Sequence, residues 1–339
     1  MQRSRSVGSL LVGLAAGIGA IALMLAMPAQ AQETRELVMS ADFDTLPGAR
    51  LTIDVPDADV ILRNGASDRV GIEVYLSAGN IERGRARSGA MNFRANGNLG
   101  EVSLRADRER GASWDWRDWG GFRITVEVTV PEEYDADVFT EDGDIAVQSL
   151  RGVVRLRSSD GDITADSLTG DVAIHTSDGD IGVRRMVGGQ IEIGTSDGDV
   201  SLGDLQATHI MIDTSDGDIS GERLAAEGIE AHTSDGDIVV SAVAGPMETS
   251  TNDGSILVGI EQLGETSLSS GDGDITIRAT GELAADLDLR GQDLSMRSEV
   301  RFDGTLERRV IRGALNGGGP GLTARTRDGS LVLRLGATE

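Results

Sequence analysis

The stretch from Thr140 to Ile277 decides the fold, because it repeats one six-residue motif eight times. The copies are TEDGDI (140–145), SSDGDI (158–163), TSDGDI (176–181), TSDGDV (195–200), TSDGDI (214–219), TSDGDI (233–238), TNDGSI (251–256) and SGDGDI (270–275). The central glycines of successive copies are 18 or 19 residues apart. Such regular self-similarity is the sequence signature of a solenoid, in which each repeat forms one rung.

Each repeat predicts short strands joined by tight corners. Asp-Gly favours a turn because glycine accepts a positive φ without steric cost, so we expect a positive φ at Gly198 and Gly217. A β-branched residue follows each motif, and pairs such as Val172 and Ile174 alternate with more polar neighbours. Alternation with a period of two is typical of a half-buried strand. No helical period occurs, so we expect three short strands in each rung.

Stacking explains how such a short rung can be stable. Rungs about 4.8 Å apart pair their backbone groups with the rungs above and below and bury a column of Ile, Leu and Val. The predicted fold class is therefore all-β: a single-stranded parallel β-helix with 18–19-residue rungs. A β-propeller fits less well, since its blades need about 40 residues each. Tandem antiparallel hairpins are a further alternative, although nothing in the repeat distinguishes their two arms.

The alternation also predicts which side chains face inward. Ile219 should lie in the core, and Ser220 should face solvent. The threonines that open the motifs (Thr176, Thr195, Thr214, Thr233 and Thr251) fall on the same side as the apolar residues, so we expect them inside or at the corner. This argues against an ice-binding threonine surface, which needs outward-facing threonines.

The first 31 residues have the features of a secretory signal peptide. Arg3 and Arg5 precede an apolar run from 8 to 27, and the sequence Ala-Gln-Ala at 29–31 fits a cleavage site. A retained membrane anchor of about 20 residues is the alternative. We therefore expect an exported protein located in the periplasm, on the outer surface or in the medium, without a membrane span after cleavage.

Residues 32–130 predict N-terminal strands or first coils followed by a tryptophan-rich hairpin loop. The segment at 57–60 reads DADV, a version of the motif with alanine in place of glycine. All three tryptophans of the chain, Trp114, Trp116 and Trp119, lie between two expected strands. They either form a local cap or bind a glycan or protein partner, since Trp is enriched in binding hot spots.

Residues 131–290 form the regular solenoid in this interpretation, and residues 291–339 are degenerate terminal rungs and a cap. A GALNGGGPG loop (313–321) precedes a last rung from Leu322 to Leu335. Residues 140–277 contain 27 acidic residues and 6 Arg, a net charge of −21, whereas residues 290–339 contain 9 Arg and 6 acidic residues, a net charge of +3. The basic end is either a terminal cap with solvated arginines or a site of head-to-tail self-association with the acidic region.

Composition excludes several functions. The 339-residue chain has a formal net charge of −25, which disfavours nucleic-acid binding. It contains no Cys, which excludes a cysteine nucleophile and disulfides. Its three histidines, His175, His209 and His232, show no metal-ligand spacing, and we expect His175 and His232 to point outward. The acidic residues recur in every rung, as a structural device would, so we expect no enzyme and no required cofactor.

The acidic residues do suggest a possible metal site along one edge. Ca²⁺ prefers oxygen ligands, and other repeat proteins bind it through Gly/Asp turns. We expect weak Ca²⁺ binding by the aspartates of five consecutive motifs: Asp160, Asp162, Asp178, Asp180, Asp197, Asp199, Asp216, Asp218, Asp235 and Asp237. The second aspartate of each motif should point outward, and the first is expected to accept hydrogen bonds from turn N–H groups.

The ordered set of motifs resembles a known family. A signal segment, the DADV segment, the repeated TSDGDI, a GGGP loop and a final RDGSL at 327–331 are together similar to the bacterial putative-adhesin solenoid family of unassigned function, related to auto-transporter adhesin head domains. The resemblance covers about residues 40–337. It implies a right-handed β-helix in the envelope or outside the cell, and it implies no catalytic residue.

The expected function is therefore that of an exported, non-enzymatic, adhesin-like solenoid with an envelope or cell-surface partner. A carbohydrate-binding module that uses the tryptophan-rich loop and a Ca²⁺-binding structural solenoid are the alternatives.

Overall fold

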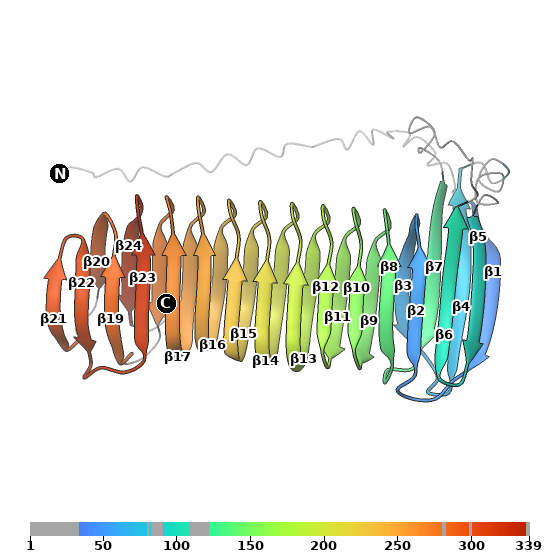
Figure 1. The fold of residues 1–339 in the computed structure, drawn as a ribbon, viewed down its shortest axis with the longest axis horizontal. Helices are drawn as coiled ribbons and strands as arrows, with labels where there is room; N and C mark the ends of the chain where they lie inside the picture. Colours follow the sequence, from blue (N-terminus) through green and yellow to red (C-terminus); the bar gives the residue numbers. More distant parts are fainter. Residues whose placement is uncertain are drawn as a thin grey trace, which may run out of the picture. The chain divides into compact units, whose positions relative to one another are not determined.

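Every secondary-structure element described in the computed structural model is a β-strand, and the strands stack in one long series (Figure 1). The structure describes residues 34–79, 82, 91–108, 122–279, 283–297 and 300–336. All 24 strands belong to one continuous hydrogen-bonded sheet. The all-β solenoid prediction is confirmed. The predicted signal segment and the tryptophan-rich loop lie outside the described residues.

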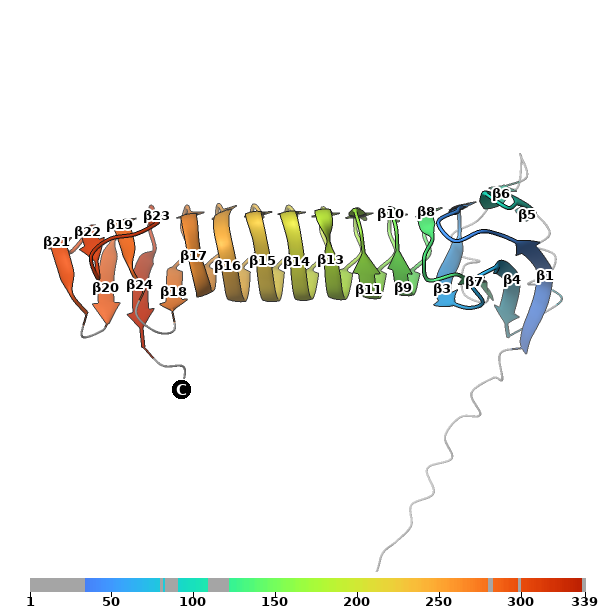
Figure 2. The ribbon, with the colours of Figure 1, turned by 90° about the horizontal axis from the view of Figure 1, so that it is seen from below.

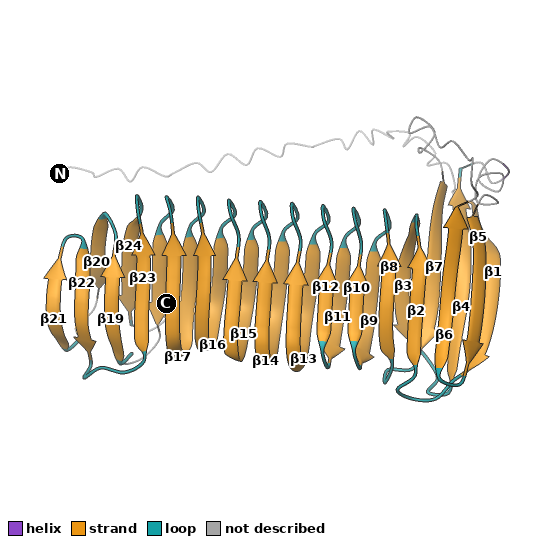
Figure 3. Cartoon of the chain, in the orientation of Figure 1, coloured by secondary structure: helices purple, strands orange, loops and turns teal. Residues whose placement is uncertain are grey.

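The regular part consists of parallel strands in register. Its strands are β8 (Asp135–Thr140), β9 (Ile145–Arg151), β10 (Val154–Arg157), β11 (Ile163–Thr169), β12 (Val172–His175), β13 (Ile181–Gly194), β14 (Val200–Asp213), β15 (Ile219–His232), β16 (Ile238–Thr251), β17 (Ile256–Ser270) and β18 (Ile275–Ala279). Equivalent residues of successive motifs pair directly, as Ile163 does with Ile181. The Asp-Gly corners form the row of loops along one edge in Figure 3.

The rungs contain fewer strand breaks than the three short strands expected. In β13 to β17 one strand of 14 or 15 residues runs through the whole rung, from one Asp-Gly corner to the next. Figure 2 shows these strands bending from one side of the solenoid to the other. In β13, β14 and β15 neighbouring rungs bend at equivalent residues, so the parallel ladder continues through the bend. Between β15 and β16 and between β16 and β17 the register shifts at the bend.

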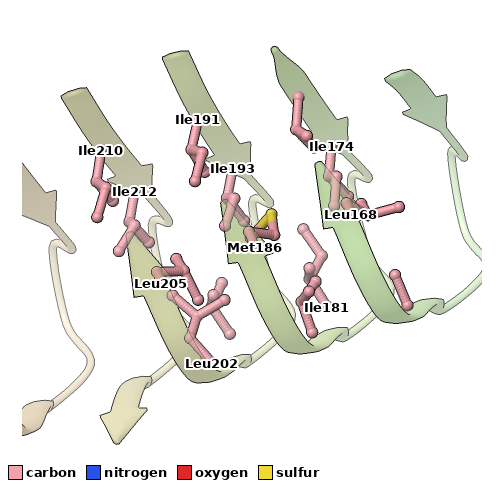
Figure 4. Close-up of a cluster of buried hydrophobic side chains, with 14 of the residues drawn as sticks. Leu168, Ile174, Ile181, Met186, Ile191, Ile193, Leu202, Leu205, Ile210 and Ile212 are labelled. Atoms are coloured by element: carbon pink, nitrogen blue, oxygen red, sulfur yellow. The ribbon is translucent and has the colours of Figure 1, made fainter. Parts of the chain in front are cut away.

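The core is a column of apolar side chains along the inside of the stack. In the central rungs it includes Ile181, Met186, Ile191 and Ile193, all at most 2% exposed. Figure 4 shows such residues from facing sides of a rung pointing toward one another. Ile219 is buried and Ser220 is exposed, as predicted. The threonine prediction is also confirmed, because Thr176, Thr195, Thr214, Thr233 and Thr251 are buried.

At the N-terminal end the order of the rungs in space differs from their order in the chain. The strands there are β1 (Thr34–Asp44), β2 (Arg50–Val55), β3 (Ala58–Asn64), β4 (Arg69–Ala78), β5 (Met91–Asn98), β6 (Glu101–Arg108) and β7 (Phe122–Val130). The rung β2–β3 lies between β6–β7 on one side and β8–β9 on the other. Three antiparallel strands complete this end: β5 pairs with β6, β4 with β7, and β1 with β4.

The C-terminal end shows the same rearrangement. Its strands are β19 (Ala285–Arg290), β20 (Asp293–Arg297), β21 (Phe302–Glu307), β22 (Val310–Leu315), β23 (Gly321–Thr326) and β24 (Ser330–Leu335). The predicted last rung, Leu322 to Leu335, is last in the chain but not in space. It lies between β17–β18 and β19–β20. The antiparallel hairpin β21–β22 then packs beside β19.

Candidate functional site

The Asp-Gly corners form the most regular surface of the protein, and their buried side is built from threonine and glycine. Thr195 Oγ1 donates to the carbonyl oxygens of Ser177 (3.2 Å) and Gly179 (3.1 Å) in the preceding rung. The same oxygen accepts a hydrogen bond from Gly198 N at 3.3 Å. Equivalent bonds recur at Thr233 and Thr251. Each buried hydroxyl is thereby satisfied by backbone groups of its own and the neighbouring rung.

The glycines of the motif do not have the positive φ predicted for Gly198 and Gly217. A Cβ atom on Gly217 would overlap the backbone carbonyl of Gly198, and one on Gly198 would overlap that of Gly179. The motif needs glycine because the rungs approach one another too closely for a side chain. Positive φ occurs instead at a different corner, where Gly170 and Gly245 both have φ of 123°.

The second aspartate of each motif connects neighbouring rungs along the outside. Its side chain is exposed, as predicted, but one carboxylate oxygen accepts a hydrogen bond from the backbone N–H at the equivalent position of the next rung. The bonds run from Asp144 N to Asp59 (3.3 Å), Asp162 N to Asp144 (3.0 Å), Asp180 N to Asp162 (2.8 Å), Asp199 N to Asp180 (2.8 Å), Asp218 N to Asp199 (2.8 Å), Asp237 N to Asp218 (2.7 Å), Ser255 N to Asp237 (2.7 Å) and Ser330 N to Asp274 (2.7 Å). We call this series the aspartate ladder.

The ladder includes segments that are far from the regular motifs in sequence. Asp59 of the DADV segment is its first member, and Ser330 of the final RDGSL segment ends it. Burial raises the pKa of Asp59 above its usual value, although the hydrogen bond from Asp144 N and the nearby Arg123 favour the charged form. The DADV segment therefore resembles the motif both in its position in a rung and in its hydrogen bond.

In the five motifs from 158 to 238 the first aspartate has no such role, contrary to the expectation that it would accept the turn N–H groups. Within the described part of the chain, five of these exposed side chains form no hydrogen bond or ion pair: Asp160, Asp178, Asp197, Asp216 and Asp235. The corner N–H groups bond instead to backbone carbonyls, as Asp197 N does to Ser177 O at 3.0 Å. These five carboxylates, the free aspartate column, are therefore available to a partner.

The ten aspartates expected to bind Ca²⁺ thus divide into two columns with different roles. Asp162, Asp180, Asp199, Asp218 and Asp237 belong to the ladder, and the other five form the free aspartate column. Among the described residues, no three His, Asp or Glu side chains form a group that could hold a metal ion. Calcium binding stays a prediction for measurement in solution.

A second surface feature is a shallow groove across the side formed by the second halves of the rungs. It has a volume of about 390 Å³ and runs over five rungs, and its polar lining includes Arg155, Gln190, Glu192, His209 and Glu230. His175 and His232 lie on this same side, and His175 Nε2 is 3.4 Å from Glu192 Oε1. The outward position predicted for His175 and His232 is confirmed, whereas no pattern in the sequence predicted the groove.

Two ion-pair clusters that no sequence pattern predicted join strands at the ends of the solenoid. Near the N-terminal end, Glu127 lies 2.6 Å from Arg35 and 3.0 Å from Arg63. Burial would raise the pKa of Glu127, but the hydrogen bond and charge of Arg35 together with Arg63 outweigh it and lower that pKa. These residues come from β1, β3 and β7, so no local sequence signal predicts the cluster.

The cluster at the C-terminal end is centred on Asp288. Its carboxylate lies 3.0 Å from Arg290, 3.1 Å from Arg312 and 3.8 Å from Arg325. Burial raises the pKa of Asp288, but the hydrogen bonds from Arg290 and Arg312 outweigh burial and hold the pKa below its usual value. Three strands, β19, β22 and β23, are thereby joined by one carboxylate.

A family model described as Toastrack DUF4097 matches residues 48–329. The chain belongs to the Toastrack DUF4097 family. The match runs from just before β2 to the last Asp-Gly corner, so it includes β2 to β23 and leaves β1 and β24 outside. No curated protein matches the sequence.

Several solved structures resemble this Toastrack protein at low identity. A "putative adhesin" from Bacteroides fragilis is 11% identical, with 88% of this chain and 97% of that chain covered and a TM-score of 0.33. A "putative lipid binding protein" from Parabacteroides distasonis is 8% identical, with 87% and 96% covered and a TM-score of 0.35. A "putative cell adhesion protein" from Clostridium sporogenes is 7% identical, with 88% and 100% covered and a TM-score of 0.20.

The remaining predicted site lies beyond the part of the chain that is described. Trp114, Trp116 and Trp119 fall between β6 and β7, the two strands expected to flank them. In the described ranges, no helix has the length and apolar character needed to cross a membrane.

Proposed function

We propose that this chain is an exported, non-enzymatic, adhesin-like protein that binds an envelope or cell-surface partner through the free aspartate column. The proposal rests on the different structural roles of the residues within the motif. Threonine, glycine and the second aspartate hold neighbouring rungs together, whereas in the five motifs from 158 to 238 the first aspartate forms no bond to the described residues.

The chemistry of this column defines the kind of partner. Carboxylates recur at each rung, with neighbours about 4.8 Å apart, along one straight edge. Such an array attracts a partner with several positive charges along an extended chain, because each additional pair raises the effective concentration for the next. Since these carboxylates form no bond to the described residues, no ion pair with those residues must break before the partner binds.

Matched charge variants test the proposal. The triple variant Asp178→Asn/Asp197→Asn/Asp216→Asn removes three charges from the column. The control Glu222→Gln/Glu227→Gln/Glu230→Gln removes three exposed charges from other sides of the solenoid. Binding to an immobilised oligo-arginine peptide is measured by surface plasmon resonance at physiological salt. We expect the column variant to lose at least ~10-fold in affinity and the control to lose much less. Equal losses of affinity in the two variants would mean that binding depends only on net charge, and would overturn the proposal.

The location of the mature chain tests the exported part of the proposal. Fractionation of the producing cell into cytoplasm, periplasm, outer surface and medium should place the chain outside the cytoplasm, without residues 1–31. Mass spectrometry of its N-terminus distinguishes a cleaved signal peptide from a retained anchor. A cytoplasmic chain that begins at Met1 would contradict this part.

A carbohydrate-binding module remains the second candidate, because three tryptophans occur within six residues between β6 and β7. A glycan array probes it directly. Glycan binding that disappears in Trp114→Ala/Trp116→Ala/Trp119→Ala but persists in the column variant would favour this candidate over the first.

A further inference from the structure

The two ends of the apolar column are less well covered than its middle. In the central rungs the inward residues are almost fully buried, as at Ile193 and Ile212. At the N-terminal end the apolar residues packed on the column are only partly buried, including Met39, Phe43 and Phe93. At the C-terminal end the same holds for Leu294, Met296, Val300 and Phe302. Each end therefore leaves apolar surface accessible to a partner.

Strands at both ends have a free edge among the described residues. At the N-terminal end β1 pairs only with β4, and β5 pairs only with β6. At the C-terminal end β21 pairs only with β22. Strand β20 has its one ladder with β24, and on its other edge Leu294 N donates to Arg308 O, so that edge is open only beyond Leu294. The end strands also expose large apolar side chains: Leu37 is 49% exposed, Val38 45% and Leu306 62%. Unpaired edges with apolar side chains are the usual sites of strand addition.

The directions of these strands allow the two ends to pair with each other. Strand β1 is antiparallel to β4, and β4 is antiparallel to β7, so β1 runs in the direction of the regular rungs. Strand β20 runs in that direction as well, because it is parallel to β24. The edges of β1 and β20 can therefore form a parallel ladder on one side of the solenoid. By the same reasoning, β5 and β21 can form an antiparallel ladder on the other side.

Charge favours a contact between unlike ends. Residues 34–44 contain one Arg and three acidic residues, a net charge of −2. Residues 290–312 contain six Arg and four acidic residues, a net charge of +2. The exposed Arg308 is placed beside β20, since its carbonyl oxygen accepts a hydrogen bond from Leu294 N at 3.1 Å. Opposite charges would face each other only where an N-terminal end meets a C-terminal end.

We propose that copies of this chain associate head to tail, with the β20–β21 edge of one copy docking on the β1–β5 edge of the next. The contact continues the apolar column and both ladders from one copy into the next. A heterologous contact of this kind does not close on itself, so it produces a linear series of copies. The inference concerns the ends of the solenoid and is independent of the free aspartate column.

Sedimentation velocity on the purified exported chain tests the proposal over ~1 to 200 μM at low ionic strength. We expect the weight-average mass to rise steadily with concentration, through dimers to longer species, because an open series has no preferred size. The C-end variant Arg308→Glu/Arg309→Glu and the N-end variant Asp42→Arg/Asp44→Arg should each remain monomeric. The control Arg155→Glu/Arg184→Glu, with equal charge reversal on the sides of the solenoid, should assemble as the original chain does.

Mixing the variants separates the possible geometries. The N-end variant retains an intact C-terminal end, and the C-end variant retains an intact N-terminal end, so an equimolar mixture should associate again. The two reversed ends also carry opposite charges, so the mixture should grow beyond dimers, as the original chain does. Circular dichroism and melting curves establish that each variant is folded. A mass that is independent of concentration in the original chain would overturn the proposal. So would a C-end variant that is monomeric beside an N-end variant that still dimerises, since this indicates a tail-to-tail contact.

Discussion

At the scale of single residues, glycine has two distinct roles in this solenoid. The motif glycines lie against the backbone of the preceding rung, and a Cβ on Gly217 would overlap the carbonyl of Gly198. Gly221, two residues after Ile219, has more space around it. A Cβ there would lie 3.5 Å from Leu224 Cγ and from Val240 Cγ1, which is ordinary van der Waals contact.

Substituting these two glycines by alanine should change the stability of the protein in opposite directions. We expect Gly217→Ala to destabilise the protein by about 3 kcal/mol, since the added methyl group forces neighbouring rungs apart. We expect Gly221→Ala to stabilise it by about 0.5–1 kcal/mol, because the methyl group fits and the unfolded chain loses conformational freedom. Urea denaturation followed by circular dichroism measures both. Equal effects at the two positions would contradict the close-approach explanation.

At the scale of one corner, the aspartate ladder explains how like charges can be stacked. Neighbouring carboxylates about 4.8 Å apart repel one another by roughly 0.9 kcal/mol in water. Each ladder carboxylate, however, accepts the N–H of the next rung, as Asp180 does from Asp199 N at 2.8 Å. Hydrogen bonds to charged acceptors are stronger than neutral ones, and they offset this repulsion.

The two aspartates of one motif should therefore respond differently to substitution. Asp180→Ala leaves Asp199 N without its acceptor, and we expect a loss of about 1 kcal/mol in the free energy of unfolding. Asp180→Asn retains an acceptor oxygen and should lose less. Asp178→Ala should be neutral or slightly stabilising, because it removes a repelling charge that has no partner. Urea denaturation decides the order; a larger loss at Asp178 would contradict the assignment.

The corner is also the place to measure calcium binding. We expect weak binding at several sites and a higher melting temperature in millimolar Ca²⁺ than in EDTA, since carboxylates and carbonyls are suitable ligands. Mg²⁺ serves as the charge control. If isothermal calorimetry gives no binding heat and the melting temperature does not change, the aspartates have no role in calcium binding. An equal shift with Mg²⁺ would indicate general charge screening.

The corner was only partly predictable from the sequence. Alternation of apolar and polar residues was sufficient to place Ile219 inside and Ser220 outside. The role of glycine was predicted wrongly, because a sequence shows turn preference but not the distance between stacked backbones. The prediction gave the N–H acceptor role to the first aspartate of the motif instead of the second, for a related reason. The acceptor in each ladder bond and its N–H donor belong to different rungs, 18 or more residues apart.

At the scale of the whole molecule, the stacking order of the terminal rungs could not be predicted from the repeated motif. Residues 285–297 and 321–335 are both weak versions of a rung, and nothing in either segment states which one stacks on β17–β18. The structure places the later segment there. Burial and long-range pairing decide this order, and the Asp288 cluster then joins β19, β22 and β23 across segments distant in the chain.

The Asp288 cluster predicts a pH dependence of stability. Because Arg290 and Arg312 outweigh burial and lower the pKa of Asp288 below its usual 3.8, the carboxylate contributes stability above that pH. This contribution is lost as the pH falls through the lowered pKa. We expect Asp288→Asn to be less stable than the original chain at pH ~6, with the difference shrinking toward pH ~3. Melting curves of both proteins check this; a constant difference would contradict it.

The inserted rung at the C-terminal end has a mechanical consequence. A tethered chain pulled at its C-terminus transmits the force to β24, which has ladders with β18 on one side and with β20 on the other. Extracting β24 along its axis loads both ladders at once in shear. Pulling at the other end acts first on β1, which has one ladder, with β4, and can peel away bond by bond. The molecule should therefore resist tension far better from its C-terminal side, and its two ends are unequal as anchoring points.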